Sequence, residues 1–130
     1  MTAHRPQDDV VLAITFQYYR DLSRAMAFYE DVMSFTLVID QGWSKIYRIG
    51  GQAHVGLVDE ARGMKNWAAE KTVQLCVRVQ DVDAWHGWAA ACGVSALSEI
   101  FESDELGIRA FTMEDPDGYQ IEIQTARPGY

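Results

Sequence analysis

The chain has 130 residues, of which 48% are hydrophobic and 12% aromatic, and this size and composition predict one compact domain, residues 1–130. Eleven basic and nineteen acidic residues give a net charge of −8, which argues against nucleic acid or an anionic membrane surface as a partner. No run reaches the roughly 18 apolar residues of a membrane span, and the first residues lack the apolar core of a signal peptide, so we expect a cytoplasmic protein. The two cysteines, Cys76 and Cys92, are predicted to be small core residues.

The first half of the chain predicts a strand, a helix and three further strands. Residues 10–19 form an apolar, strand-like run, and Asp21 follows as a helix N-cap whose carboxylate accepts from first-turn amides. Apolar residues then recur at three- and four-residue spacing, as in an amphipathic helix: Leu22, Ala25, Met26, Tyr29 and Met33. Three short β-rich segments complete this half: residues 35–39, 45–49 and 53–58.

Residues 59–71 connect this half to a second one with the same pattern. Residues 73–79 predict a strand, Asp81 caps a second helix, and Gly93 ends that helix in a left-handed conformation. Three further strands are predicted at residues 95–101, 108–113 and 119–124. The turn 115–118, Asp-Pro-Asp-Gly, separates the last two because proline presets its φ and glycine accepts a positive one.

The two halves, residues 10–58 and 72–125, repeat one order of elements, β-α-β-β-β. Their capping residues, Asp21 and Asp81, are sixty positions apart. One helix covers only one face of a four-stranded sheet, so the other face is left for the partner half or for a ligand. We therefore expect an α+β fold in which two βαβββ modules form a curved mixed sheet around a central cleft, with the helices on the outer face.

Two segments resemble the signatures of a known superfamily. Residues 21–29 read Asp-Leu-Ser-Arg-Ala-Met-Ala-Phe-Tyr, and residues 115–123 read Asp-Pro-Asp-Gly-Tyr-Gln-Ile-Glu-Ile. Both are similar to motifs of the vicinal-oxygen-chelate superfamily, which comprises glyoxalases, bleomycin-resistance proteins and extradiol dioxygenases. Ser34 stands where that family usually has glycine, a departure confined to a local turn. The resemblance spans about residues 10–125 and implies a small-molecule cavity and a homodimer.

Strand alternation assigns side chains to the two faces of the sheet, since neighbouring residues point to opposite sides. The apolar sets are predicted to pack under the helices: Val55, Leu57, Val73, Leu75, Val77, Val79, Tyr119, Ile121 and Ile123. The residues between them, including His54, Gly56, Gln74 and Glu122, are then predicted to face the cleft. Ile14 gives the first strand an apolar cleft wall.

The resemblance also implies where a metal ion would bind. Metal-dependent members carry one ligand on each of four strands, and the matching positions here are Ile14, Gly56, Gln74 and Glu122. Isoleucine and glycine have no donor side chain, so we predict no metal site. His54 leaves one alternative open, in which His54, Gln74 and Glu122 hold a single divalent ion.

Several other residues are candidates for the cleft. Glu122 is the candidate catalytic residue, as a general base with a raised pKa; it could instead attract a cationic ligand, or simply pair with Gln74 or Arg109. Aromatic rings stack on planar or cationic ligands, although core packing is the alternative for each of them. The candidate ligand-binding residues are Phe16, Trp43, Tyr47, His54, Trp67, Gln74, Arg109 and Phe111.

Three functions are compatible with these residues. The first is metal-free binding or sequestration of an aromatic or cationic small molecule, without a cofactor. The second is a metal-dependent lyase, isomerase or dioxygenase that uses His54, Gln74 and Glu122. The third is a metal-free enzyme with Glu122 as its base. The sequence does not decide whether the protein is an enzyme, or whether the two halves pair within one chain or between two.

Overall fold

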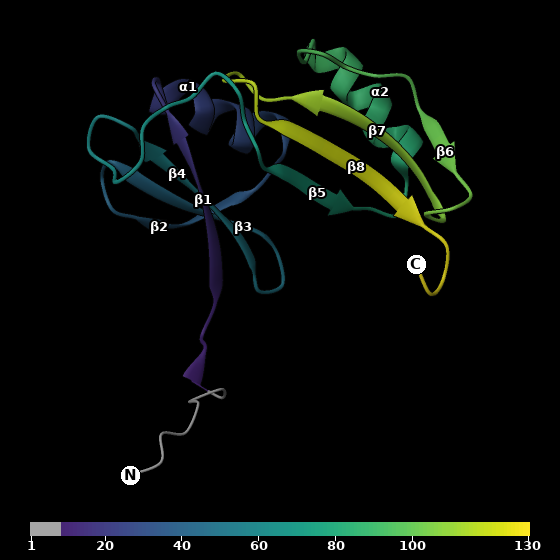
Figure 1. Cartoon of the computed structure of the whole chain (residues 1–130), viewed down its shortest axis with the longest axis horizontal. Helices are drawn as coiled ribbons and strands as arrows, with labels where there is room; N and C mark the ends of the chain where they lie inside the picture. The colour runs from purple at the N-terminus through teal and green to yellow at the C-terminus, as the bar shows by residue number, and fades with distance from the viewer. Residues whose placement is uncertain (1–8) are drawn as a thin grey trace.

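The computed structural model describes residues 9–130; residues 1–8, on which the prediction of a missing signal peptide depends, lie outside the described part. The predicted order β-α-β-β-β is confirmed twice (Figure 1). The first module contains β1 (Ala13–Tyr19), α1 (Leu22–Ala27), the π-helical turn η2 (Phe28–Val32), β2 (Thr36–Asp40), β3 (Ser44–Gly50) and β4 (Ala53–Asp59). The second module contains β5 (Gln74–Arg78), α2 (Val82–Cys92), β6 (Phe101–Ser103), β7 (Ile108–Glu114) and β8 (Gln120–Ala126).

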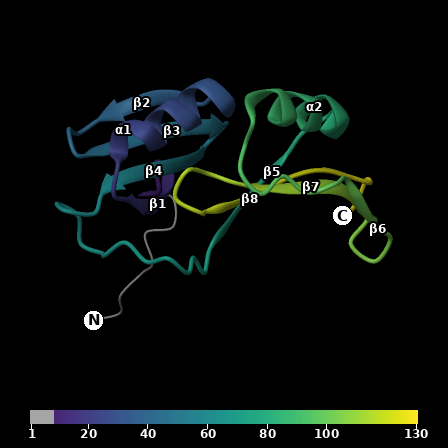
Figure 2. The same ribbon diagram turned by 90° about the horizontal axis from the view of Figure 1, so that it is seen from above.

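The two modules share one sheet topology, as the repeat predicts. The strand orders are β1-β4-β3-β2 and β5-β8-β7-β6, and in each sheet the first pair is parallel and the others are antiparallel. The predicted α+β fold of two βαβββ modules is confirmed, and its mixed sheet consists of two four-stranded sheets, one in each module. Figures 1 and 2 show them side by side, each with its own helix on one face. Within residues 9–130, no helix or strand covers the other face of each sheet, and that face is called its uncovered face below.

Local chemistry explains where the helices begin and end. The Asp21 carboxylate accepts from the Arg24 amide at 3.1 Å, and Asp81 accepts from the Ala84 amide at 3.0 Å, so both predicted N-caps are confirmed. Gly93 ends α2 with φ 69°, as predicted. Ser34 adopts a φ of 57°, so it takes the left-handed conformation that favours glycine and keeps the turn after η2.

The hydrophobic core lies between each sheet and its helix. Val55, Leu57, Ile121 and Ile123 are all buried there, which confirms the faces predicted for β4 and β8. Burying an aliphatic side chain of this size contributes about 1.5–3 kcal/mol. The predicted strand 95–101 is the main error in the second half: only Phe101–Ser103 forms β6, and Ser95 makes an isolated bridge to β7.

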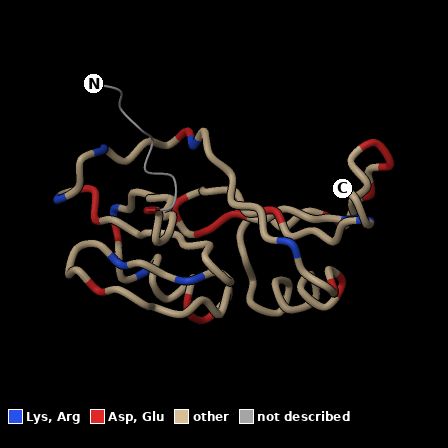
Figure 3. The backbone as a smooth tube through the Cα atoms, turned by 90° about the horizontal axis from the view of Figure 1, so that it is seen from below, with Lys and Arg blue, Asp and Glu red and all other residues tan. Residues whose placement is uncertain are grey.

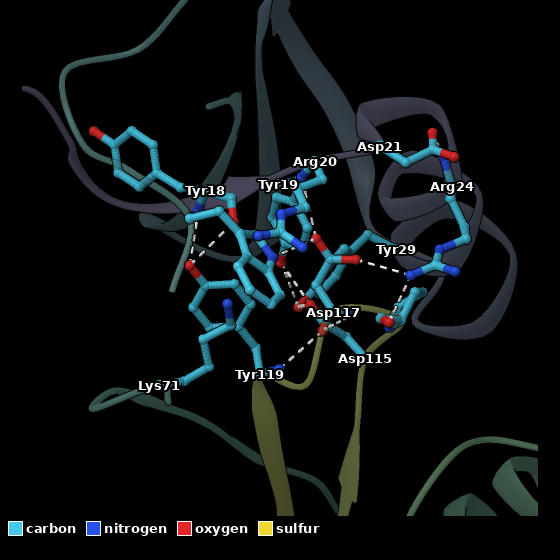
Figure 4. Close-up of polar contacts among 12 residues, drawn as sticks. Tyr18, Tyr19, Arg20, Asp21, Arg24, Tyr29, Lys71, Asp115, Asp117 and Tyr119 are labelled. Carbon is cyan, nitrogen blue, oxygen red and sulfur yellow. Dashed lines mark hydrogen bonds and ion pairs between the residues drawn. The ribbon is translucent and has the colours of Figure 1, made fainter. Parts of the chain in front are cut away.

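A buried polar network joins the two modules at the turn before β8 (Figure 4). Oδ2 of Asp115 accepts hydrogen bonds from the hydroxyls of Tyr19 and Tyr29, at 2.6 and 2.9 Å. Oδ1 of Asp115 accepts from the Asp117 and Tyr119 amides at 2.9 and 3.0 Å. Burial raises the pKa of the Asp115 carboxyl, and the two tyrosine hydroxyls act in the opposite direction. This side chain therefore links the last turn of the second module to β1 and η2 of the first.

Asp117 makes a second set of contacts at the same junction. Its carboxylate accepts from the Trp67 indole Nε1 at 3.1 Å and pairs with the Arg24 guanidinium at 2.9 Å. The guanidinium carbon of Arg20 lies over the Trp67 ring, 3.6 Å from the ring centroid, in a cation–π contact. Residues 59–71, the connector between the modules, are thus held against the junction.

Candidate functional site

The uncovered face of the first sheet carries an open aromatic groove. Its volume is about 470 Å³, within the size range of small-molecule sites. The groove is lined by Phe16, Tyr18, Gln41, Trp43, Ser44, Val58, Gly63 and Met64. These residues come from β1, the β2–β3 turn, the start of β3, the end of β4 and the connector. We call this the aromatic groove.

Alternation along β1 places its aromatic side chains in the groove. Gln17 and Tyr19 point into the core and are buried, so Phe16 and Tyr18 point to the opposite face. Phe16 is 43% exposed and Trp43 is 39% exposed, values unusual for large aromatic side chains. Two half-exposed rings at one groove offer stacking surfaces for a planar ligand, each worth about 0.5–1.5 kcal/mol beyond the area buried.

Two glycines shape the groove by close approach. A Cβ on Gly56 would lie 2.3 Å from Cδ1 of Phe16, so the phenyl ring occupies the space of a side chain at position 56. A Cβ on Gly63 would lie 2.5 Å from Cγ1 of Val58 and 2.8 Å from Cε1 of Tyr18. Glycine at position 63 therefore lets the connector lie directly against the wall of the groove.

The uncovered face of the second sheet is polar and consists of cross-strand pairs between β5 and β8. The Gln74 amide donates to Gln120 at 2.6 Å, and Arg78 Nε donates to Gln124 at 2.7 Å. Gln74 and Gln120 line a second, polar pocket of about 540 Å³, together with Ala69, Lys71, Thr72, Val73, Glu114 and Gly118. The two uncovered faces thus differ in character, one aromatic and one polar.

Glu122 lies on this polar face, as alternation predicts. Its Oε2 is 3.8 Å from Sγ of Cys76 and accepts a hydrogen bond from Gln124. Burial and the neighbouring Glu122 raise the pKa of the Cys76 thiol, so the thiol rests in its protonated form. Both cysteines are exposed, so the prediction that they are core residues is wrong.

Arg109 takes no part in this face. Its guanidinium pairs with Asp83 on α2 at 2.7 Å and with Glu102 on β6 at 3.2 Å, which places it on the helix side of β7. The predicted ligand contact of Arg109 is therefore corrected to a surface ion pair. The alternative pairing of Glu122 with Arg109 is excluded for the same reason.

The four family metal positions do not form a donor set that fits a divalent ion. Ile14 and Gly56 lie on the uncovered face of the first sheet, as predicted, and neither side chain has a lone pair to donate. His54 is on the same sheet and its Nδ1 bonds the Gln52 carbonyl at 2.8 Å, whereas Gln74 and Glu122 are on the other sheet. Within residues 9–130, no group of three His, Cys, Asp or Glu side chains is placed to hold a metal ion.

The predicted aromatic contacts divide into three groups. Phe16 and Trp43 lie in the aromatic groove. Tyr47 and Phe111 are fully buried in the core, where Tyr47 donates to Glu30 at 2.7 Å, so their prediction as ligand contacts is corrected. Trp67 lies where the connector meets the second module, and its indole donates to Asp117. Tyr18 and Met64 were missed, although alternation from Ile14 and Phe16 already placed Tyr18 on the groove face.

Comparison with known families and structures identifies the fold. The family model described as Glyoxalase/Bleomycin resistance protein/Dioxygenase superfamily matches residues 11–123. No curated protein matches the chain by sequence. No helix in residues 9–130 has the length and apolar character needed to cross a bilayer.

Three solved structures with this fold cover nearly the whole chain. A glyoxalase/bleomycin resistance protein/dioxygenase from Nocardioides has a TM-score of 0.75 and 17% identity, over 99% of this chain and 89% of its own. Lactoylglutathione lyase from Agrobacterium tumefaciens has a TM-score of 0.70 and 21% identity, over 90% and 93%. The fosfomycin resistance protein FosX from Listeria monocytogenes has a TM-score of 0.72 and 15% identity, over 92% and 95%. At these identities the likeness concerns the fold alone.

Proposed function

Because the chain belongs to the Glyoxalase/Bleomycin resistance protein/Dioxygenase superfamily, we propose that it binds a planar aromatic small molecule in the aromatic groove without a metal ion. Binding requires only a surface of matching shape and polarity, and the residues that line this groove supply stacking rings together with the amide of Gln41 and the hydroxyls of Tyr18 and Ser44. The proposed activity is sequestration of the ligand in the cytoplasm.

One observation carries this proposal: the ring of Phe16 fills the space of a side chain at position 56. The superfamily's ligand position on β4 is therefore replaced by an aromatic surface. On β1, Ile14 likewise puts an apolar side chain at the family's ligand position. A Cβ added to Gly56 would lie 3.2 Å from Cγ2 of Ile14. An apolar wall in place of two donors favours stacking over ion coordination.

Calorimetric titration with 2-naphthylmethanol, a neutral planar compound, tests the proposal. Trp43→Leu is expected to weaken binding by about tenfold, since it removes stacking and buried apolar area. Prior dialysis against EDTA should leave the wild-type Kd unchanged. Trp88→Leu is the matched control, because Trp88 is 48% exposed on α2, away from the groove.

Two results would contradict this function. One is a stoichiometric divalent ion in the purified protein whose removal abolishes binding. The other is a Kd for 2-naphthylmethanol that Trp43→Leu and Phe16→Ala leave unchanged.

We further propose that the protein is a homodimer, since no helix or strand among the described residues covers either uncovered face. Val73, 47% exposed, places apolar surface beside the uncovered face of the second sheet, and a second copy would bury it. Light scattering coupled to size exclusion is expected to give the mass of two chains. The mass of one chain across the accessible concentration range would refute the dimer.

A further inference from the structure

Arg62, on the connector, is a charged residue beside the aromatic groove. Its guanidinium carbon lies 5.7 Å from the centroid of the Trp43 ring, within the range of a cation–π contact. Its side chain makes no ion pair with the described residues, whereas Arg24 and Arg109 lie within 3 Å of a carboxylate oxygen. Arg62 therefore places a positive charge outside any ion pair of the described residues beside an aromatic surface.

Backbone contacts fix the position of this charge. The amides of Arg62 and Gly63 both donate to the Asp59 carbonyl at 3.0 Å, which forms a tight turn directly after β4. The Asp59 amide donates to the Trp43 carbonyl at 2.9 Å, so the turn is tied to the residue whose ring Arg62 approaches. Farther along the connector, the Trp67 indole Nε1 donates to the Asp117 carboxylate at 3.1 Å.

The rest of the groove is electrically neutral. None of its eight lining side chains is charged, and four of them are aromatic or aliphatic, with methionine as a fifth. Residues 59–71 carry three acidic and three basic side chains, whereas the whole chain has a net charge of −8; Figure 3 shows how acidic and basic residues are distributed along the backbone. Charges farther away than about 8 Å are screened at physiological salt, so the charged groups of the connector act on a ligand more strongly than those elsewhere in the chain.

We propose that Arg62 makes the groove selective for a planar aromatic ligand that carries a carboxylate beside its ring. The ring stacks on Trp43 and Phe16, and the carboxylate accepts from the guanidinium, whose planar set of donors matches two carboxylate oxygens. A cationic ligand would meet Arg62 as a like charge. This inference rests on the proposed function, and it replaces the aromatic-or-cationic class that the sequence left open.

Three naphthalene compounds of the same ring and different charge test it: 2-naphthoate, 2-naphthylmethanol and 2-naphthylmethylammonium. At pH 7.5 and 0.15 M salt, calorimetry is expected to give a Kd for naphthoate about fivefold lower than for the alcohol, and the weakest binding for the ammonium. The preference for naphthoate should shrink at 0.5 M salt, since the exposed pair is then screened.

Matched variants assign the preference to one side chain. Arg62→Gln is expected to abolish the fivefold preference and leave the Kd of the alcohol within about twofold. Arg62→Lys should retain part of the preference because it keeps the charge and loses the paired donors. Lys65→Gln makes the same change in net charge on the same connector, and it should retain the full preference.

The outcomes separate this inference from the function on which it rests. If the alcohol binds and naphthoate binds no better, or if the ammonium binds best, Arg62 does not select the ligand, although the groove still binds aromatic compounds. If none of the three compounds binds, the proposed function itself fails. If Lys65→Gln and Arg62→Gln reduce the preference equally, general charge and not the position of Arg62 is responsible, and the inference is overturned.

Discussion

Replacing Asp115 by alanine is expected to lower the free energy of unfolding by about 3–5 kcal/mol, because a buried carboxylate accepts four hydrogen bonds there. Without it the amides of Asp117 and Tyr119 lose their acceptor. The hydroxyls of Tyr19 and Tyr29 then keep Oε1 of Gln17, 2.7 and 3.1 Å away, and their mutual contact at 3.3 Å. The two modules lose their central polar contact, so we also expect unfolding to become less cooperative.

Urea denaturation followed by circular dichroism and by tryptophan fluorescence measures both effects. Asp115→Asn is the matched variant: it keeps the shape and one carbonyl oxygen, and it should cost less than Asp115→Ala. Asp104→Ala is the surface control, since Asp104 is exposed and pairs loosely with Arg127 at 3.8 Å. A midpoint for Asp115→Ala equal to that of wild type would show that the network does not hold the modules together.

The sequence predicts most of the fold because its signals are local. The caps at Asp21 and Asp81 and the glycine at position 93 depend on residues within one turn of a helix, and all three are confirmed. The strand at 95–101 fails because Ala96 has a φ of 53°, which interrupts an extended chain and is not expected from a β-compatible sequence. The hydrogen-bonded strand order within each module depends on the pairing of distant strands, which leaves no local pattern in the sequence.

The candidate site was predicted only in part, for a related reason. Phe16 was predicted to face the cleft from its position on β1, and the structure places its side chain in the aromatic groove. Phe111 and Tyr47 lie on strands with buried residues on both faces, where alternation does not distinguish the core side from the cleft side. Asp115 was interpreted as a turn residue, because its partners Tyr19 and Tyr29 are 96 and 86 positions away in the chain.

Two substitutions, Phe111→Ala and Phe16→Ala, test which of the two rings contacts the ligand, because we expect the first to lower stability and the second to weaken binding. Phe111 is fully buried, and its ring meets the His86 ring edge-on at 5.0 Å, so Phe111→Ala is expected to cost about 3–5 kcal/mol of stability. The Kd of the folded protein for 2-naphthylmethanol should be unchanged, since the side chain does not reach the groove. Phe16 is 43% exposed, so Phe16→Ala should cost far less stability and weaken binding severalfold.

Measuring the unfolding midpoint and the Kd for both variants separates the two roles. Phe111→Leu extends the test if the alanine variant does not fold, because it retains most of the buried volume. If a folded Phe111 variant loses affinity while Phe16→Ala retains it, the ligand binds on the helix side of the second sheet. The aromatic groove would then be an unused surface. The opposite result is the one we expect, because Phe16 has an exposed ring in the aromatic groove, whereas the Phe111 ring is fully buried.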